Sequence, residues 1–297
     1  MTLRAHMMDC PLMISDILVH AAKCHGDQEI VSRLPEDGTI HRETYAQAHE
    51  RTKQLANALT KKLKIKEGDR VATIAWNSHR HFELYYGISG MGAVVHTVNP
   101  RLDPKQIVWM LEHAQAKAVF FDKQFAPIVD GISKMCKSVK NWVLMTDKSH
   151  ADAVKTKCKT YEELIAEQSS DFDWPVFDEY TAAGLCYTSG TTGDPKGVLY
   201  SHRSNVLHAM ACSASDVIGV GARGTLVTFH QDDFPDPAGL LAYVDRLKGT
   251  AKLRPDMKLV ISRAWGSPES RLNGLFQLTK GLSGVVRKSR KNAKAAA

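Results

Sequence analysis

The stretch CYTSGTTGDPKGVLYSH, residues 186–202, gathers more small, hydroxylated and basic residues than any other part of the chain. Its glycines Gly190 and Gly193 let the backbone turn tightly and approach a ligand without a Cβ in the way. Hydroxyl groups and one ammonium group surround these glycines, on Thr188, Ser189, Thr191, Thr192 and Lys196. Backbone N–H groups in such a turn bind anions, and each charge-assisted hydrogen bond contributes roughly 1.5–3 kcal/mol. The stretch therefore predicts a phosphate-binding loop, with enough donors for a triphosphate.

Two generic alternatives compete with this interpretation. The Walker A pattern, G-x-x-x-x-G-K-[ST], does not fit, because counting from Gly190 puts Pro195 at the second glycine and Gly197 follows the lysine. An ordinary P-loop NTPase is therefore disfavoured. A surface loop rich in Ser, Thr and Gly between two strands stays open from composition alone.

The eleven residues from Tyr187 to Gly197, YTSGTTGDPKG, resemble the phosphate-binding signature of the adenylate-forming (AMP-binding) enzymes, which include acyl-CoA synthetases, luciferases and adenylation domains. In that family the loop holds the β- and γ-phosphates of ATP while a carboxylate attacks the α-phosphate, and a thiol then takes the acyl group. The resemblance implies ATP, Mg²⁺ and coenzyme A, but it assigns no catalytic residue and no metal ligand in this chain. The ATP-loop residues that it implies are Thr188, Ser189, Gly190, Thr191, Thr192, Gly193 and Lys196.

A second stretch, NSHRHFELYYGISGMGAVVHTVNPRL at residues 77–102, looks like the corresponding region of fatty-acyl-CoA synthetases. This resemblance implies a fatty-acid–CoA ligase (AMP-forming) whose substrate is a medium- or long-chain fatty acid rather than an amino acid. For four large side chains of this stretch, we expect that they pack a helix against the sheet rather than line an acyl pocket. These side chains are Phe82, Tyr85, Tyr86 and Met91.

Short apolar runs alternate with amphipathic stretches along the chain. The runs predict buried strands at 71–75, 93–98, 118–121, 142–145 and 182–187. Amphipathic stretches predict helices between them, and Thr44 is the expected N-cap of a long helix that precedes the first run. The order predicts an α/β fold with a mostly parallel sheet flanked by helices, which the resemblance identifies as an incomplete N-terminal domain of an adenylate-forming enzyme.

Two histidines, His202 and His208, follow the loop on a helix that Ser201 is expected to cap. Neither has a carboxylate partner nearby in the sequence. A structural or capping role is therefore expected for both, rather than proton transfer.

The composition, 43% apolar and 24% charged over 297 residues, is that of a globular chain. The net charge of +7 owes much to five basic residues near the C-terminus, so nucleic acid is not an expected partner. Six cysteines without a C-x-x-C pair predict neither a zinc site nor a disulfide framework, and a reducing, cytoplasmic setting fits them. No apolar run has the length of a signal peptide or a membrane span.

The resemblance ends near Phe229-His230. We expect residues 1–230 to be a partial adenylation domain and residues 231–297 an unassigned tail with a basic C-terminus. The adenine-contacting segment, the ribose-binding Asp and the C-terminal domain with its catalytic Lys are not recognised, so a truncated or fused gene product is expected. A non-catalytic nucleotide- or phosphate-binding remnant is the alternative. An incomplete domain would leave apolar faces of its sheet uncovered, and such faces would favour homo-oligomers.

Overall fold

The computed structural model describes residues 7, 10–152, 154–188, 194–213 and 226–228. The chain divides into two compact units, Met1–Phe229 and His230–Ala297, and every described residue belongs to the first. The Phe229-His230 pair and the predicted tail lie outside the described residues.

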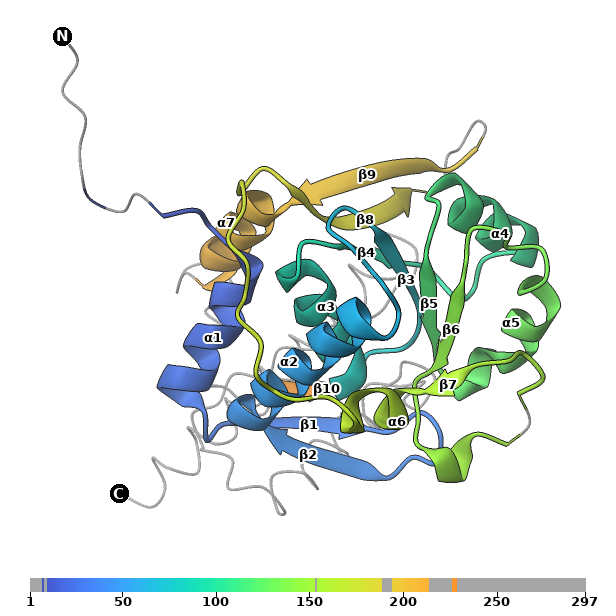
Figure 1. Ribbon diagram of the computed structural model, residues 1–297, viewed down its shortest axis with the longest axis horizontal. Helices are drawn as coiled ribbons and strands as arrows, with labels where there is room; N and C mark the ends of the chain where they lie inside the picture. Colours follow the sequence, from blue (N-terminus) through green and yellow to red (C-terminus); the bar gives the residue numbers. More distant parts are fainter. Residues whose placement is uncertain (1–6, 8–9, 153, 189–193, 214–225, 229–297) are drawn as a thin grey trace, which may run out of the picture. The chain divides into compact units, whose positions relative to one another are not determined.

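The main sheet of the described residues has seven strands in the order β7-β6-β5-β3-β4-β8-β9 (Figure 1). Neighbouring strands are parallel except β8 and β9, which form an antiparallel hairpin. The prediction of a mostly parallel α/β sheet is therefore confirmed. The strands are β3 (Arg70–Ile74), β4 (Val94–Thr97), β5 (Ala118–Phe121), β6 (Asn141–Leu144), β7 (Lys159–Thr160), β8 (Ala182–Thr188) and β9 (Lys196–Ser201).

Helices cover both faces of this sheet, which explains why its central strands are apolar at successive positions. One face packs against α2 (Tyr45–Lys61), α3 (His79–Gly90) and α6 (Tyr161–Ala166). The other face packs against α4 (Pro104–His113) and α5 (Ala126–Ile132), and Figure 1 shows the two sets of helices on opposite sides of β5. Within β5, Phe120 joins the first core and Phe121 the second, because successive side chains of a strand point to opposite faces.

Helix α2 begins where the sequence predicts. The Thr44 hydroxyl accepts a hydrogen bond from the Gln47 N–H at 3.2 Å, and the Gln47 side chain accepts one from the Thr44 N–H at 2.8 Å. This reciprocal capping box satisfies two N–H groups that would otherwise have no partner at the helix start.

A second, smaller sheet has the order β10-β1-β2. β1 (Glu29–Arg33) and β2 (Ile40–Thr44) form an antiparallel hairpin, whereas β10 (Leu226–Thr228) pairs with β1 in parallel. The remaining elements are α1 (Ile14–His25), α7 (His202–Ser213) and the short 3₁₀ segments η1 (Lys123–Phe125) and η2 (Lys148–His150). The sequence gives no local signal for the pairing of β10 with β1, because the two strands lie far apart along the chain.

The large side chains of α3 only partly follow the predicted packing. Met91, just after the helix, is buried in the core, and Phe82 and Tyr86 are half-buried with ring centroids 4.9 Å apart. Tyr85 is 44% exposed and is therefore not buried by this packing, although its side chain hydrogen-bonds to Thr97 of β4. The helix buries Leu84 and Ile88 against the sheet, and Tyr85 lies off that stripe.

Candidate functional site

The predicted phosphate loop connects β8 to β9. The last register pair of this hairpin is Thr188 with Lys196, and the Thr188 hydroxyl donates to the Lys196 carbonyl at 3.4 Å. Both residues are exposed. Of the seven implied loop residues, the structure brings these two together at the base of the hairpin. The other five, which lie outside the described residues, are Ser189, Gly190, Thr191, Thr192 and Gly193.

The topology of the sheet explains why this end of the hairpin suits a ligand. β8 is parallel to β4, so Thr188 lies at the carboxyl edge of the sheet. The chain leaves β3 through α3 on one face and leaves β4 through α4 on the other face. Ligands of open α/β sheets bind outside the carboxyl ends of strands where the connections change face in this way. The hairpin base lies beside that point, because β4 is the neighbour of β8.

His202 has the structural role that the sequence predicts. Its side chain is fully buried, its Nδ1 accepts a hydrogen bond from the Ile14 N–H at 3.3 Å, and its ring lies 4.8 Å from that of Phe177. Burial lowers its pKa to about 4, so the ring is neutral near pH 7. His202 therefore joins the start of α7 to the start of α1.

His208 lies six residues, about 1.7 turns, further along α7 and is exposed. Its Nε2 is 3.5 Å from the Cys212 sulfur, four residues ahead on the same helix. This contact is local to α7, as is expected of a residue without a catalytic partner.

A network of charged side chains that the sequence analysis missed joins the helices on one face of the sheet. Arg51 on α2 donates to Glu83 on α3 at 2.6 Å and to Glu162 on α6 at 3.0 Å. Arg80 donates to the same Glu162 and to Glu36, both at 2.7 Å. These pairs are separated by between 32 and 111 residues, so no local spacing reveals them.

Glu83 is the most deeply buried member of this network, with no exposed surface. Burial raises the pKa of its carboxyl, and the Arg51 guanidinium opposes that shift. The Tyr161 hydroxyl donates a further hydrogen bond to the carboxylate at 2.5 Å. The network stabilises the contact between three helices and is remote in sequence from the phosphate loop.

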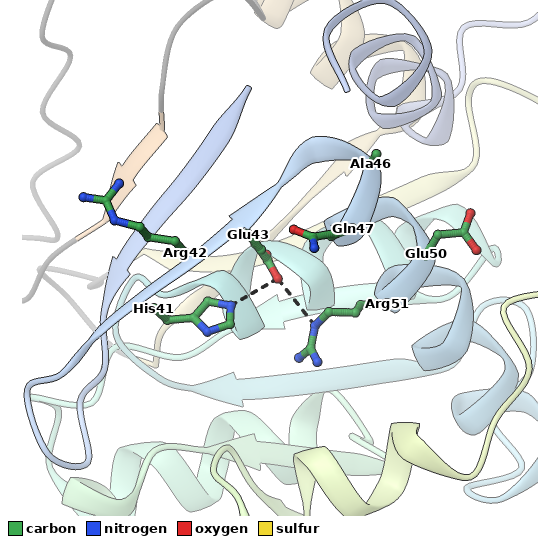
Figure 2. Close-up of a pocket in the computed structure, with 7 residues that line it drawn as sticks. All are labelled: His41, Arg42, Glu43, Ala46, Gln47, Glu50 and Arg51. Carbon is green, nitrogen blue, oxygen red and sulfur yellow. Dashed lines mark hydrogen bonds and ion pairs between the residues drawn. The ribbon is translucent and has the colours of Figure 1, made fainter. Parts of the chain in front are cut away.

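A pocket of about 430 Å³ opens beside this network, between β2 and α2. Figure 2 shows Glu43 pointing between His41 and Arg51, with its Oε2 3.3 Å from His41 Nε2 and 3.5 Å from Arg51 Nε. The His41 ring also stacks on His79, with centroids 3.8 Å apart. Neither of the two described ATP-loop residues, Thr188 and Lys196, lines this pocket.

Metal-ligating residue types do not cluster in the part of the chain that the structure describes: no group of three or more His, Cys, Asp or Glu is arranged to hold an ion. Nor does any helix among these residues have the length and apolar character needed to cross a bilayer.

Comparison with known proteins decides the family. The family model described as AMP-binding enzyme matches residues 18–231. The chain belongs to this family. Within it, the chain is 46% identical over 239 residues to the 3-methylmercaptopropionyl-CoA ligase of Ruegeria lacuscaerulensis, covering 78% of this chain and 44% of that relative.

Two further relatives agree with this assignment. A medium-chain-fatty-acid–CoA ligase of Ectopseudomonas oleovorans is 44% identical over 236 residues, covering 78% of this chain and 43% of the relative. The crystal structure of the N-terminal domain of FACL13 from Mycobacterium tuberculosis superposes with a TM-score of 0.56 at 29% identity, covering 70% of this chain and 48% of that one. The chain therefore spans less than half the length of these curated relatives. The resemblance drawn from the signature is confirmed for the family.

Proposed function

We propose that this chain supplies the ATP-phosphate-binding part of an AMP-forming fatty-acid–CoA ligase. The proposed reaction joins ATP and a carboxylic acid into an acyl-adenylate and pyrophosphate, and then passes the acyl group to coenzyme A. The residues proposed to hold the outer phosphates of ATP are Thr188, Ser189, Gly190, Thr191, Thr192, Gly193 and Lys196.

The observation that carries this proposal is the position of the β8–β9 hairpin. It puts an exposed lysine and an exposed threonine, Lys196 and Thr188, at the carboxyl edge of the sheet, next to the point where the connections change face. A phosphate group at that edge meets a positive charge and hydroxyl donors in solvent-accessible positions. We propose that Mg²⁺ enters with the nucleotide, since Mg²⁺ is usually held by substrate phosphates together with only one or two carboxylates.

The proposed substrate class is a medium- or long-chain fatty acid. Support comes from the name of the Ectopseudomonas relative, and the name of the Ruegeria relative adds 3-methylmercaptopropionate as a shorter acid that a test must include. We further propose that residues 1–230 form the adenylation part, that residues 231–297 are an unassigned tail, and that the protein is cytoplasmic and forms homo-oligomers.

Calorimetric titration of the purified chain with ATP and Mg²⁺ tests the phosphate site directly. Lys196→Ala is expected to weaken ATP binding about 10- to 150-fold, the range for one charge-assisted hydrogen bond. Lys159→Ala is the matched control, because Lys159 is an exposed strand lysine at the opposite edge of the sheet. Equal ATP affinity in the wild type and Lys196→Ala would contradict the proposal.

Turnover separates the ligase from the alternative of a phosphate-binding remnant. AMP release is measured with ATP, coenzyme A, an acid panel of octanoate, palmitate and 3-methylmercaptopropionate, and hydroxylamine as an acyl trap. Acid-dependent AMP release supports the ligase. ATP binding without any AMP release supports the remnant instead.

A further inference from the structure

We propose that His113 and Tyr187 form a positioning pair that fixes the base of the phosphate loop, so that His113 sets nucleotide affinity without touching the nucleotide. This inference rests on the proposed function, because it concerns the same loop. It assigns a role to a helix residue 74 positions away from the strand that it holds.

Tyr187 is the first residue of the signature and the penultimate residue of β8, directly before Thr188. Its hydroxyl oxygen is 2.6 Å from Nδ1 of His113, the last residue of α4, and the two atoms share a hydrogen bond. Burial raises the pKa of the Tyr187 hydroxyl, which therefore stays protonated near pH 7 and can donate to a neutral imidazole. This bond ties the strand that leads into the loop to the end of a helix.

The helix provides a rigid base for this bond. Asp103 caps its first turn, and Ile107, Met110 and Leu111 are at most 1% exposed in the core. The His113 ring also stacks on Trp109, one turn earlier, with centroids 4.6 Å apart and an interplanar angle of 13°. Contacts within α4 therefore fix the orientation of the imidazole that bonds to the tyrosine.

The Tyr187 ring is enclosed by other rings as well. Its centroid lies 6.1 Å from that of Trp109, with the rings nearly perpendicular, and 5.1 Å from that of His96. His96 is fully buried, neither ring nitrogen has a hydrogen-bond partner, and burial lowers its pKa to about 4. A neutral His96 thus packs against the tyrosine ring at an interplanar angle of 50° and makes no hydrogen bond to it, so the orientation of the ring depends on the bond that the Tyr187 hydroxyl makes with His113.

The opposite strand of the hairpin depends on the same ring. Tyr187 pairs with Gly197 in the register of β8 and β9. A Cβ at Gly197 would lie 3.3 Å from two atoms of the Tyr187 ring and 3.2 Å from Leu185 Cδ1. Because the ring lies across this glycine, its position controls both strands at the base of the loop. A shift of the ring would therefore move Lys196, the residue just before Gly197 on β9, relative to Thr188.

Calorimetric titration of ATP with Mg²⁺ into four full-length variants tests the pair. Tyr187→Phe and His113→Ala each remove the hydrogen bond and are expected to weaken ATP binding about 2- to 13-fold, the range for one neutral hydrogen bond. His113→Asn keeps a polar atom near the position of Nδ1 and is expected to restore most of the affinity. The double variant with His113→Ala and Tyr187→Phe is expected to bind no more weakly than the weaker single variant, because both remove one bond.

His150→Ala is the matched control, because His150 also uses Nδ1 in a side-chain bond, at 3.0 Å to Asp147, but lies after β6. Thermal melting of each variant separates positioning from stability: the expected result is a change in ATP affinity at an unchanged midpoint for Tyr187→Phe. Wild-type affinity in both Tyr187→Phe and His113→Ala overturns the pair and leaves the proposed function standing. A wild-type chain that binds no ATP overturns the proposed function itself, and the role of the pair with it.

Discussion

The middle of the main sheet and its β9 end are built differently. All four residues of β5 are completely buried between two layers of helices. On β9, by contrast, Leu199 is 61% exposed, and α7 buries only His202 and Val206 among its described side chains. Stability is thus concentrated where the sheet is covered on both faces. Thr188 and Lys196, at the base of the predicted phosphate loop, lie at this thinly covered end and are exposed.

The largest expected effect comes from the ion network of the covered region. Glu83→Ala removes a completely buried carboxyl group and leaves the half-buried guanidinium of Arg51 with fewer partners, so it is expected to lower the free energy of unfolding by about 3–5 kcal/mol, measured by urea denaturation. Glu167→Ala, which removes an exposed partner of Lys62, is the control and should leave that free energy unchanged. A loss for Glu83→Ala no greater than that for the control would show that the network contributes little.

A matched pair of leucines tests the difference in packing. Leu84→Ala removes a completely buried side chain of α3 and is expected to cost about 2–5 kcal/mol of unfolding free energy. Leu199→Ala, on the exposed β9, is expected to stay within about 0.5 kcal/mol of wild type. Similar losses for both variants would mean that β9 is covered in solution, as in the proposed homo-oligomer. In that case the loss of unfolding free energy for Leu199→Ala should become smaller when the protein is diluted.

The same substitution at two glycines is expected to have opposite effects. Gly197→Ala forces a Cβ against the Tyr187 ring and is expected to cost about 1–3 kcal/mol of unfolding free energy. Gly131→Ala lies in α5, where a Cβ meets no atom within 4 Å, and is expected to stabilise the protein by about 0.4–1 kcal/mol. Thermal denaturation of the two variants measures whether each one is less or more stable than the wild type. A neutral Gly197→Ala would show that the base of the hairpin tolerates displacement.

A further expected effect is a slope of stability with pH. Burial lowers the pKa of both His81 and His96 to about 4, whereas an unfolded histidine titrates near 6.5. Between pH 6.5 and 4 the unfolded chain binds more protons at these sites, so the free energy of unfolding falls as the pH falls through that window. Each histidine contributes up to about 1.4 kcal/mol per pH unit.

His96→Leu removes one of these contributions. Because neither ring nitrogen of His96 has a partner, this variant is also expected to match or exceed the wild-type stability at pH 7. Urea denaturation at pH 5 and pH 7 measures the slope. An unchanged slope in the variant would show that His96 does not titrate below its unfolded pKa.

Local patterns in the sequence were enough to predict most of the fold. The run at Ala118–Phe121 becomes β5 with the predicted bounds, because burial on both faces is a local signal. Helix α4 lies between β4 and β5 as predicted, and the Asp103 cap followed by Pro104 is the local signal for its start. The pairing of β10 with β1 and the contact of Arg51 with Glu162 were not predicted, since they join distant segments and have no periodic signature.

The candidate site shows the same limit. The signature predicts which residues form the loop, and the hairpin puts Thr188 and Lys196 at its base. The signature does not predict that His113 holds Tyr187. The two residues are 74 positions apart, and nothing in that spacing distinguishes His113 from other surface residues. Contacts that hold a loop from outside depend on how helices pack, and packing is a property of the whole domain.

The ring of Tyr187 occupies the space that a side chain at position 197 would need, so the two positions limit each other's size. In an alignment of relatives, residue volumes at these two columns should therefore be anticorrelated: alanine or serine at the position of Gly197 should accompany a smaller side chain at the position of Tyr187.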